Sequence, residues 1–157
     1  MQDQFSRTRL LLGEERMQRL HGARVAVFGL GGVGSYLVEA LVRSGVGTLD
    51  LVDNDRISLT NLNRLLYATH ENIGRLKIEV VTERICTICP ETVVHTYPCF
   101  YTPETADGFD FSQYDYVVDA VDTVTAKIDL VLAAKAAGTP VISSMGAGNK
   151  IHPELFE

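Results

Sequence analysis

The stretch Val25-Ala26-Val27-Phe28-Gly29-Leu30-Gly31-Gly32-Val33-Gly34 decides the fold of this chain. It is an apolar, β-branched run that ends in a glycine turn, and an amphipathic helical pattern over residues 36–42 follows at once. Glycines at 29, 31 and 34 allow a tight strand-to-helix turn and a close approach of the backbone to phosphate, and Gly32 removes one more Cβ. The helix N-terminus adds free N–H groups and a positive dipole end. The stretch therefore predicts a nucleotide site, and the alternative is a glycine turn that only packs.

Strand and helix patterns alternate along the rest of the chain, which is typical of a parallel sheet with right-handed crossovers. We expect an α/β fold with a doubly wound, mostly parallel, Rossmann-like sheet. Strands are expected at 24–29, 49–53, 93–97, 116–119 and 140–144, and helices at 8–20, 34–44, 75–89 and 125–137. Residues 1–22 are expected to form an N-terminal helical segment and residues 23–157 the nucleotide-binding domain.

An acidic residue, Asp53, ends the second expected strand, at the interval from the glycine turn at which a carboxylate binds a ribose hydroxyl in dinucleotide sites. This spacing alone would suit an NAD-dependent oxidoreductase. However, the polar stretch 54–64 follows, with amide and guanidinium groups that can bind phosphate or purine. Lys77 then lies in the first turn of the next expected helix, where the dipole disfavours a cation, so an anionic ligand would explain it. A solvated surface lysine is the alternative.

Five motifs together resemble a known family. The glycine turn, the strand end at Asp53, the run Thr60-Asn61-Leu62-Asn63-Arg64, Lys77 and the run Asp119-Ala120-Val121-Asp122 resemble, in this order, the adenylating domain of ubiquitin-activating enzymes and of the bacterial thiamine- and molybdopterin-pathway adenylyltransferases. Within that group, the segment 5–15, the pair Asp122-Thr123 and the segment 143–150 are most similar to the tRNA threonylcarbamoyladenosine dehydratases. The resemblance runs nearly from end to end.

The resemblance implies ATP and Mg²⁺ as cofactors. The glycine turn would lie against the phosphates, Asp53 would hold the ribose, Asp122 would hold Mg²⁺, and Asp119 would support its strand end. An arginine of the N-terminal segment would reach the site of a neighbouring protomer in a homodimer; Arg7 is the best match and Arg9 its rival. The catalytic residues implied are Arg7, Arg64 and Asp122, and the nucleotide-binding residues are Gly29, Gly31, Gly32, Gly34, Asp53, Asp55, Asn61, Asn63, Arg64, Lys77, Asp122 and Thr123.

The implied chemistry is activation of a carboxylate as an acyl adenylate. Hydroxide is a poor leaving group because its conjugate acid has a pKa of about 15.7. A phosphate monoester is a better one, because its second pKa is about 6. In the dehydratases the carboxylate belongs to a threonyl group on a tRNA adenosine, and ring closure then removes water. The alternatives are adenylation of the C-terminal glycine of a ubiquitin-like sulfur carrier, an NAD-dependent oxidoreductase, and a non-catalytic nucleotide-binding scaffold, with a sulfur-relay enzyme as a partner.

Composition is consistent with a globular chain: 157 residues, 46% of them hydrophobic, with a net charge of −6. Apolar runs are too short for a membrane span and no signal peptide is seen, so a cytoplasmic location is expected. Residues 80–157 are strongly acidic, which does not favour RNA binding. We therefore expect a tRNA surface to come from a local patch, a dimer groove or further chain, since the dehydratase pattern continues beyond residue 157.

Three cysteines have no assigned catalytic role. The pair Cys86 and Cys89 has the spacing of half a zinc site, but no second pair is visible, and both are expected on the apolar side of a helix as buried thiols. Cys99 follows a strand and is expected to be accessible.

Overall fold

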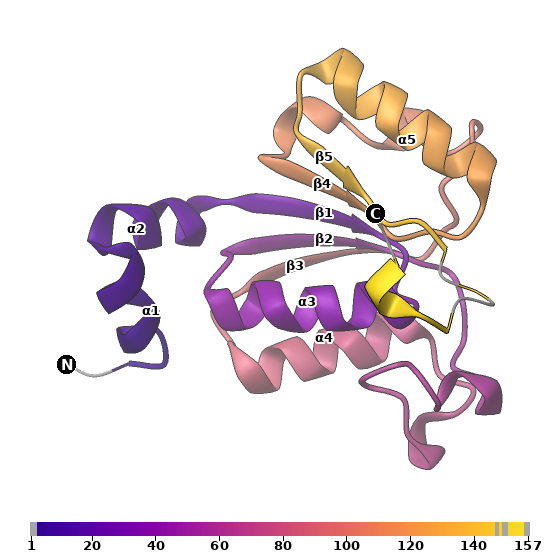
Figure 1. The fold of residues 1–157 in the computed structure, drawn as a ribbon, viewed down its shortest axis with the longest axis horizontal. Helices are drawn as coiled ribbons and strands as arrows, with labels where there is room; N and C mark the ends of the chain where they lie inside the picture. The colour runs from indigo at the N-terminus through magenta and orange to yellow at the C-terminus, as the bar shows by residue number, and fades with distance from the viewer. Residues whose placement is uncertain (1–2, 147, 149–150, 156–157) are drawn as a thin grey trace.

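The computed structural model describes residues 3–146, 148 and 151–155, which form a five-stranded sheet with helices on both faces (Figure 1). Every pair of neighbouring strands is parallel, in the order β3-β2-β1-β4-β5. The predicted doubly wound parallel sheet is therefore confirmed. The strands are β1 (Arg24–Phe28), β2 (Thr48–Val52), β3 (Val93–Tyr97), β4 (Tyr116–Asp119) and β5 (Val141–Ser143).

Strand order reverses beside β1, because β2 and β3 lie on one side of it and β4 and β5 on the other. In open parallel sheets such a reversal leaves a crevice at the carboxyl ends of the strands, where ligands bind. Asp53 and Asp119 therefore lie at the carboxyl ends of the two strands that flank β1.

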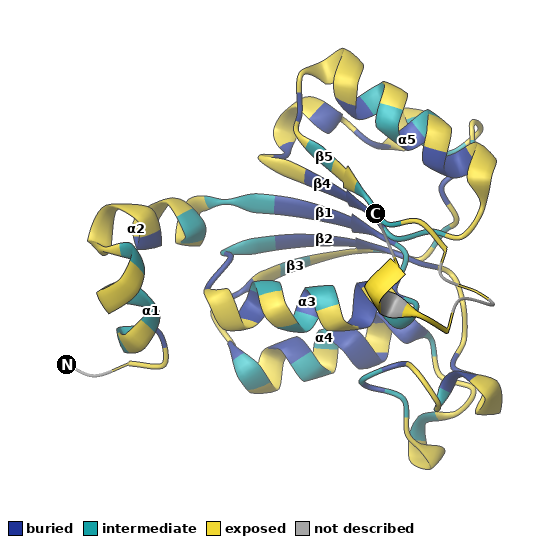
Figure 2. Cartoon of the chain, viewed as in Figure 1, coloured by how far each residue is buried: buried dark blue, intermediate teal, exposed yellow. Residues whose placement is uncertain are grey.

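Two helices, α3 (Gly32–Ser44) and α4 (Lys77–Ile88), cover one face of the sheet, and α5 (Val124–Ala137) covers the other (Figure 1). Strand residues alternate between the two faces, as β geometry requires. Val25, Val27, Leu49 and Leu51 pack toward α3 and α4, and Ala26, Phe28, Val52 and Val117 pack toward α5. Figure 2 shows the central strands as the most continuously buried part of the molecule.

Element ends differ from expectation by a residue or two, for local reasons. Strand β1 stops at Phe28 because Gly29 turns the chain with φ +92°. Helix α4 begins at Lys77 rather than at Arg75, because the Arg75 carbonyl accepts the N–H of Ile57 and so belongs to the preceding loop.

The predicted single helix over residues 8–20 is wrong, since the structure has two helices there, α1 (Ser6–Leu12) and α2 (Glu14–Gly22). Gly13 separates them with φ +81° and ψ +165°, a conformation that glycine adopts readily and that no α-helix contains. Phe5 and Met17 are buried and anchor the pair to the core. Both helices lie beyond the amino ends of the strands (Figure 1).

A long polar connection leads from β2 to α4 and contains the 3₁₀ turns Leu59–Asn61 and His70–Asn72. Its two ends lie side by side, because backbone hydrogen bonds join Ile57 to Arg75 (2.9 Å), Gly74 to Ile57 (2.8 Å) and Lys77 to Asp55 (3.0 Å). The remaining 3₁₀ turns are Ala106–Gly108, Phe111–Gln113 and Pro153–Leu155.

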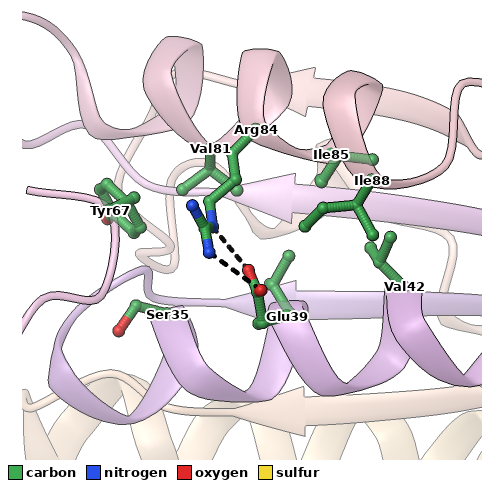
Figure 3. A pocket seen from close by; sticks show the side chains of 9 residues that line it. Ser35, Glu39, Val42, Tyr67, Val81, Arg84, Ile85 and Ile88 are labelled. Carbon is green, nitrogen blue, oxygen red and sulfur yellow. Dashed lines mark hydrogen bonds and ion pairs between the residues drawn. The ribbon is translucent and has the colours of Figure 1, made fainter.

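An ion pair between Arg84 and Glu39 links helices α3 and α4. The Arg84 guanidinium donates to Glu39 at 2.6 and 2.9 Å, and these hydrogen bonds hold the pKa of Glu39 below its ordinary value. Figure 3 shows the pair in a small hollow lined by apolar side chains of both helices. This hollow is lined mainly by α3 and α4, with Tyr67 of the β2–α4 connection at one end.

One fully buried carboxylate, Asp50, lies in the middle of β2. Arg24 donates to it at 3.0 and 2.7 Å, and the Tyr97 hydroxyl donates at 3.0 Å, while His95 Nδ1 lies 3.0 Å away. Burial opposes ionisation of Asp50, but the hydrogen bonds from Arg24, His95 and Tyr97 outweigh it and lower the pKa. This cluster ties β1, β2 and β3 together.

The three thiols are free, and one expectation about them was wrong. Cys89 is buried at the end of α4, as expected, but Cys86 is exposed because it lies one position away from the buried Ile85 on the outer side of the helix. Cys99 is partly buried, and burial raises the pKa of its thiol. In the described part of the chain, no helix is both long enough and apolar enough for a membrane crossing.

Candidate functional site

In the glycine turn between β1 and α3, backbone segments pack directly against each other at two positions, with no room for side chains there. A Cβ on Gly34 would lie 1.9 Å from the Gly29 carbonyl oxygen, and a Cβ on Gly29 would lie 2.7 Å from the Ala120 carbonyl oxygen. These two glycines are therefore required by packing. Around Gly31, by contrast, a Cβ would meet nothing within 4 Å, so this side of the turn is open. The open side adjoins the N-terminus of α3, which has no side-chain cap.

Asp53 is a buried carboxylate that holds the glycine turn. Its Oδ2 accepts the N–H of Leu30 at 2.7 Å, and its Oδ1 accepts the N–H of Asp55 at 2.8 Å. Burial raises the pKa of Asp53, although these hydrogen bonds and the nearby Lys77 act against the rise. The structure thus gives Asp53 a role in positioning the turn; contact with a ribose stays a prediction.

Lys77 is the first residue of α4 and is buried. Its Nζ donates to Asp55 Oδ2 at 2.6 Å and lies 4.0 Å from Asp53 Oδ2. These carboxylates explain why a cation stands in the first turn of a helix, a position for which the sequence suggested only an anionic ligand or solvent. The alternative of a solvated surface lysine is wrong. Asp55 is the partner of Lys77 in this structure, and its contact with a nucleotide stays a prediction.

The side chain of Arg64 lies over the glycine turn, since a Cβ on Gly32 would come within 3.3 Å of its Cδ. The guanidinium is exposed, and its Nη1 donates to the Thr60 carbonyl at 2.9 Å and to Asn63 Oδ1 at 3.0 Å. Asn63 therefore helps to fix the position of the Arg64 guanidinium. Asn61 is buried, and its Oδ1 accepts the N–H of Ser58 at 3.1 Å, which caps the 3₁₀ turn.

Asp122 and Thr123 are exposed in the turn between β4 and α5. This turn touches the glycine turn through Ala120, whose N–H donates to the Phe28 carbonyl at 2.8 Å. Asp119 is fully buried and supports the end of β4, as predicted. Both of its oxygens accept hydrogen bonds from Lys127 Nζ, at 3.1 and 3.0 Å.

Sequence reasoning missed two residues of this site. Lys127 carried a signal, because its helical spacing places it with Leu130 and Ala134 on the buried side of α5. A buried charge there needs a partner. Tyr67 carried none that we can identify. Its buried hydroxyl donates to the Leu30 carbonyl, and burial raises its pKa far above the ordinary value. Asp53 thus accepts the N–H of Leu30, and Tyr67 donates to the carbonyl of the same residue.

The structure does not bring Arg7 or Arg9 to these residues. Both lie on α1, beyond the amino ends of the strands, whereas the glycine turn and Asp53 lie at the carboxyl ends (Figure 1). Arg9 is paired with Asp3 at 3.0 Å and with Glu14 at 2.9 Å, while Arg7 is exposed. Of the two, Arg7 is therefore the arginine more accessible to a neighbouring molecule.

A magnesium ion held by protein side chains alone would need several oxygen ligands in one place. Among the described residues, no group of three or more His, Cys, Asp or Glu side chains could hold a metal ion. Mg²⁺ in nucleotide sites commonly uses one or two carboxylates together with phosphate oxygens and water. Asp122 is an exposed carboxylate at the correct edge of the sheet for such sharing.

Comparison with known proteins identifies relatives of the whole described fold. The chain is 45% identical over 157 residues to the tRNA threonylcarbamoyladenosine dehydratase of Bacillus subtilis, covering 100% of this chain and 62% of the relative. It is 38% identical over 153 residues to the enzyme of that name from Escherichia coli, covering 98% and 57%. A Candida glabrata adenylyltransferase and sulfurtransferase is 36% identical over 132 residues, covering 84% and 30%.

A solved structure agrees with these sequence relatives. The crystal structure of the Escherichia coli tRNA N6-threonylcarbamoyladenosine dehydratase in complex with ATP superimposes with a TM-score of 0.92 at 38% identity, covering 96% of this chain and 62% of that one. The same enzyme was also crystallised with AMP. This chain thus spans about three fifths of the length of these dehydratases. The ThiF family model matches residues 5–156, and the chain belongs to the ThiF family.

Proposed function

We propose that this chain is the ATP-binding part of a tRNA threonylcarbamoyladenosine dehydratase. It binds ATP, transfers the adenylyl group to a carboxylate and so prepares the threonylcarbamoyl group of a tRNA adenosine for cyclisation with loss of water. One observation carries the proposal: the open side of the glycine turn, the arginine over Gly32 and the buried pair of Asp53 with Lys77 meet at the carboxyl edge of the sheet. The ATP and AMP complexes of the Escherichia coli relative support it.

The proposed roles follow from charge and access. Gly31 and Gly32 would lie against the phosphates, because this side of the turn has no Cβ in the way. Asp53 would bind the ribose with the lone pairs that its two backbone hydrogen bonds leave free. Arg64 and Lys77 would offset the charge that gathers on the α-phosphate during attack.

Mg²⁺ would be held by Asp122 together with phosphate oxygens, and when bound it would supply further neutralisation of the triphosphate. This role is supported by the turn that carries Asp122, because that turn touches the glycine turn through Ala120. Thr123 would contribute its hydroxyl at the same turn.

The reaction that we propose has two displacements. A carboxylate oxygen of the threonyl group attacks the α-phosphorus, and pyrophosphate leaves. A neighbouring nucleophile of the same substrate then attacks the acyl carbon, closes the ring and expels AMP, which carries away the carboxylate oxygen. The net result is loss of one water from the modified adenosine and conversion of ATP to AMP and pyrophosphate. No general base is needed for the first step, because the carboxylate is already ionised near neutral pH.

The assembly that we propose is a symmetric homodimer in which Arg7 completes the site of the neighbouring protomer. Its support is the position of α1, at the opposite end of the strands from its own glycine turn. We expect Arg7→Ala and Asp122→Asn chains, each inactive alone, to regain part of the activity when they are refolded together, because some mixed dimers contain one intact site. Absence of any recovery would contradict the role of Arg7 across the interface.

The remaining proposals concern the setting of the enzyme. Residues 1–22 would form the N-terminal helical segment that crosses the dimer interface, and residues 23–157 the nucleotide-binding domain. The tRNA is the proposed substrate, the cytoplasm the proposed compartment and a sulfur-relay protein a proposed further partner. The RNA contacts would come from further chain beyond residue 157, from the dimer groove or from a local patch, because the net charge of −6 opposes a general attraction to a polyanion.

The decisive experiment measures which acceptor stimulates AMP release from labelled ATP. Threonylcarbamoyl-modified tRNA should do so, and unmodified tRNA, which lacks the carboxylate, is the matched control. Stimulation only by a carrier protein ending in Gly-Gly would favour the second candidate, which the Candida glabrata relative supports. ATP binding with no stimulation by either acceptor would indicate a nucleotide-binding scaffold, and tighter binding of NAD than of ATP with Mg²⁺ would indicate an oxidoreductase.

A further inference from the structure

The buried lysine of α5 forms one node that joins three elements at the candidate site. Lys127 Nζ donates to Asp119 at the end of β4 and also to the Val121 carbonyl, at 2.9 Å, in the turn that carries Asp122. Asp119 in turn accepts the N–H of Val121 at 3.1 Å and the hydroxyl of Ser143 on β5 at 2.5 Å. The lysine side chain is only 8% exposed, so these partners replace its water almost completely.

This node holds the part of the β4–α5 turn next to Asp122, whose own side chain is exposed. Asp122 and its neighbours Thr123 and Val124 are exposed, and the N-cap of α5 makes no side-chain hydrogen bond. A buried charge pair with several hydrogen bonds fixes geometry even where it adds little net stability, because breaking it leaves an uncompensated charge. The conformation of residues 120–123 therefore depends on Lys127.

The turn that carries Asp122 also lies next to the glycine turn, where the nucleotide is proposed to bind. Gly29 and Ala120 are in backbone contact, so the β4–α5 turn lies directly against the glycine turn. We propose that Lys127 is a positioning residue: from within the core it sets the distance of the Asp122 carboxylate from the glycine turn, and hence how well Mg²⁺ and ATP bind together. This inference rests on the proposed function for the identity of the ligand.

The test compares Lys127→Met with Lys135→Met, which removes an exposed lysine from the last turn of the same helix. ATP affinity is measured by calorimetry in excess EDTA and in excess Mg²⁺. The gain in affinity that Mg²⁺ gives should fall about tenfold in Lys127→Met, the lower end of the effect of losing an outer partner of a metal ligand. It should be unchanged in Lys135→Met, and the affinity in EDTA should stay within about twofold in both variants, because the glycine turn, Asp53 and Lys77 are intact.

A second variant guards against loss of folding, since Lys127→Met leaves Asp119 buried without its cation. The double variant Asp119→Asn/Lys127→Met is neutral at the node, keeps an oxygen for Val121 and should show the same reduced gain. Faster hydrogen exchange at the amides of residues 120–123, relative to the unchanged chain, is expected in both. An unchanged Mg²⁺ gain in a folded Lys127→Met or double variant would overturn the inference. Failure of the unchanged chain to bind ATP would instead refute the proposed function, and the exchange data would still decide whether Lys127 orders the turn.

Discussion

Replacement of Gly34 by alanine is the sharpest test of the glycine turn. The added Cβ would lie 1.9 Å from the Gly29 carbonyl oxygen, and about 1.1 Å of separation is needed before the contact reaches 3.0 Å. The obstacle is backbone on both sides, so no side-chain rotation can relieve it. The displacement would also pull on Leu30, whose N–H is held by Asp53 at 2.7 Å.

The expected loss of stability follows from these two effects. Overpacking of this kind costs about 1–3 kcal/mol, and loss of a hydrogen bond to a charged group costs about 1.5–3 kcal/mol. We therefore expect Gly34→Ala to lower the free energy of unfolding by about 3–5 kcal/mol. For a domain of this size the melting temperature should fall by about 6–20 °C. Calorimetric melting and ATP titration of the same samples provide the measurement.

Gly31→Ala is the matched control, because its Cβ would meet nothing within 4 Å and its φ is already −79°. Alanine is a poorer N-cap than glycine, which should cost only about 0.5–1 kcal/mol. The fold should survive while ATP affinity drops, because the new methyl group faces the proposed phosphates. Should Gly34→Ala melt within 2 °C of the unchanged chain, about the size of an ordinary surface substitution, the packing argument would be refuted.

Three further results are expected. Arg64→Ala should weaken ATP binding in calorimetry about tenfold or more, the cost of a lost charge-assisted contact, while Arg75→Ala on the same loop should not; equal affinities would remove Arg64 from the site. Asp122→Asn should keep the fold and ATP binding in EDTA but lose Mg²⁺-dependent turnover, and full activity would contradict its metal role. Asp50→Asn should lower the free energy of unfolding in urea by about 2–3 kcal/mol at pH 7, less than for a fully buried pair because Arg24 keeps 27% exposure. Because the folded pKa of Asp50 is lowered, its contribution is complete above the unfolded pKa of about 3.9 and is lost as pH falls through the folded value; an equal difference between variant and unchanged chain at pH 7 and in strong acid would contradict this.

The sequence predicts the sheet well, because burial of parallel strands on both faces leaves continuous apolar runs and the glycine turn is required by contacts between nearby segments. It predicts residue types at the site better than their partners. The sequence singles out Lys77 by its place at the start of a helix, but its pairing with Asp55 depends on how a polar connection folds back, and no local pattern encodes that. The helical spacing of Lys127 from Leu130 and Ala134 indicates a buried lysine, but its partner on β4 cannot be identified from the helix alone. The break at Gly13 was missed because the apolar pattern continues across it.

The pinned ends of the connection between β2 and α4 have a consequence for how this region can vary. Backbone hydrogen bonds join residues 55–57 to residues 74–77, so Asp55 and Lys77 stay adjacent regardless of the path between them. Lengthening a closed loop is inexpensive, about 0.6 kcal/mol for each doubling. The tip around His70 and Glu71, both exposed, is thus a natural place for insertions, tags or reporter groups that leave the charge arrangement at the sheet edge intact.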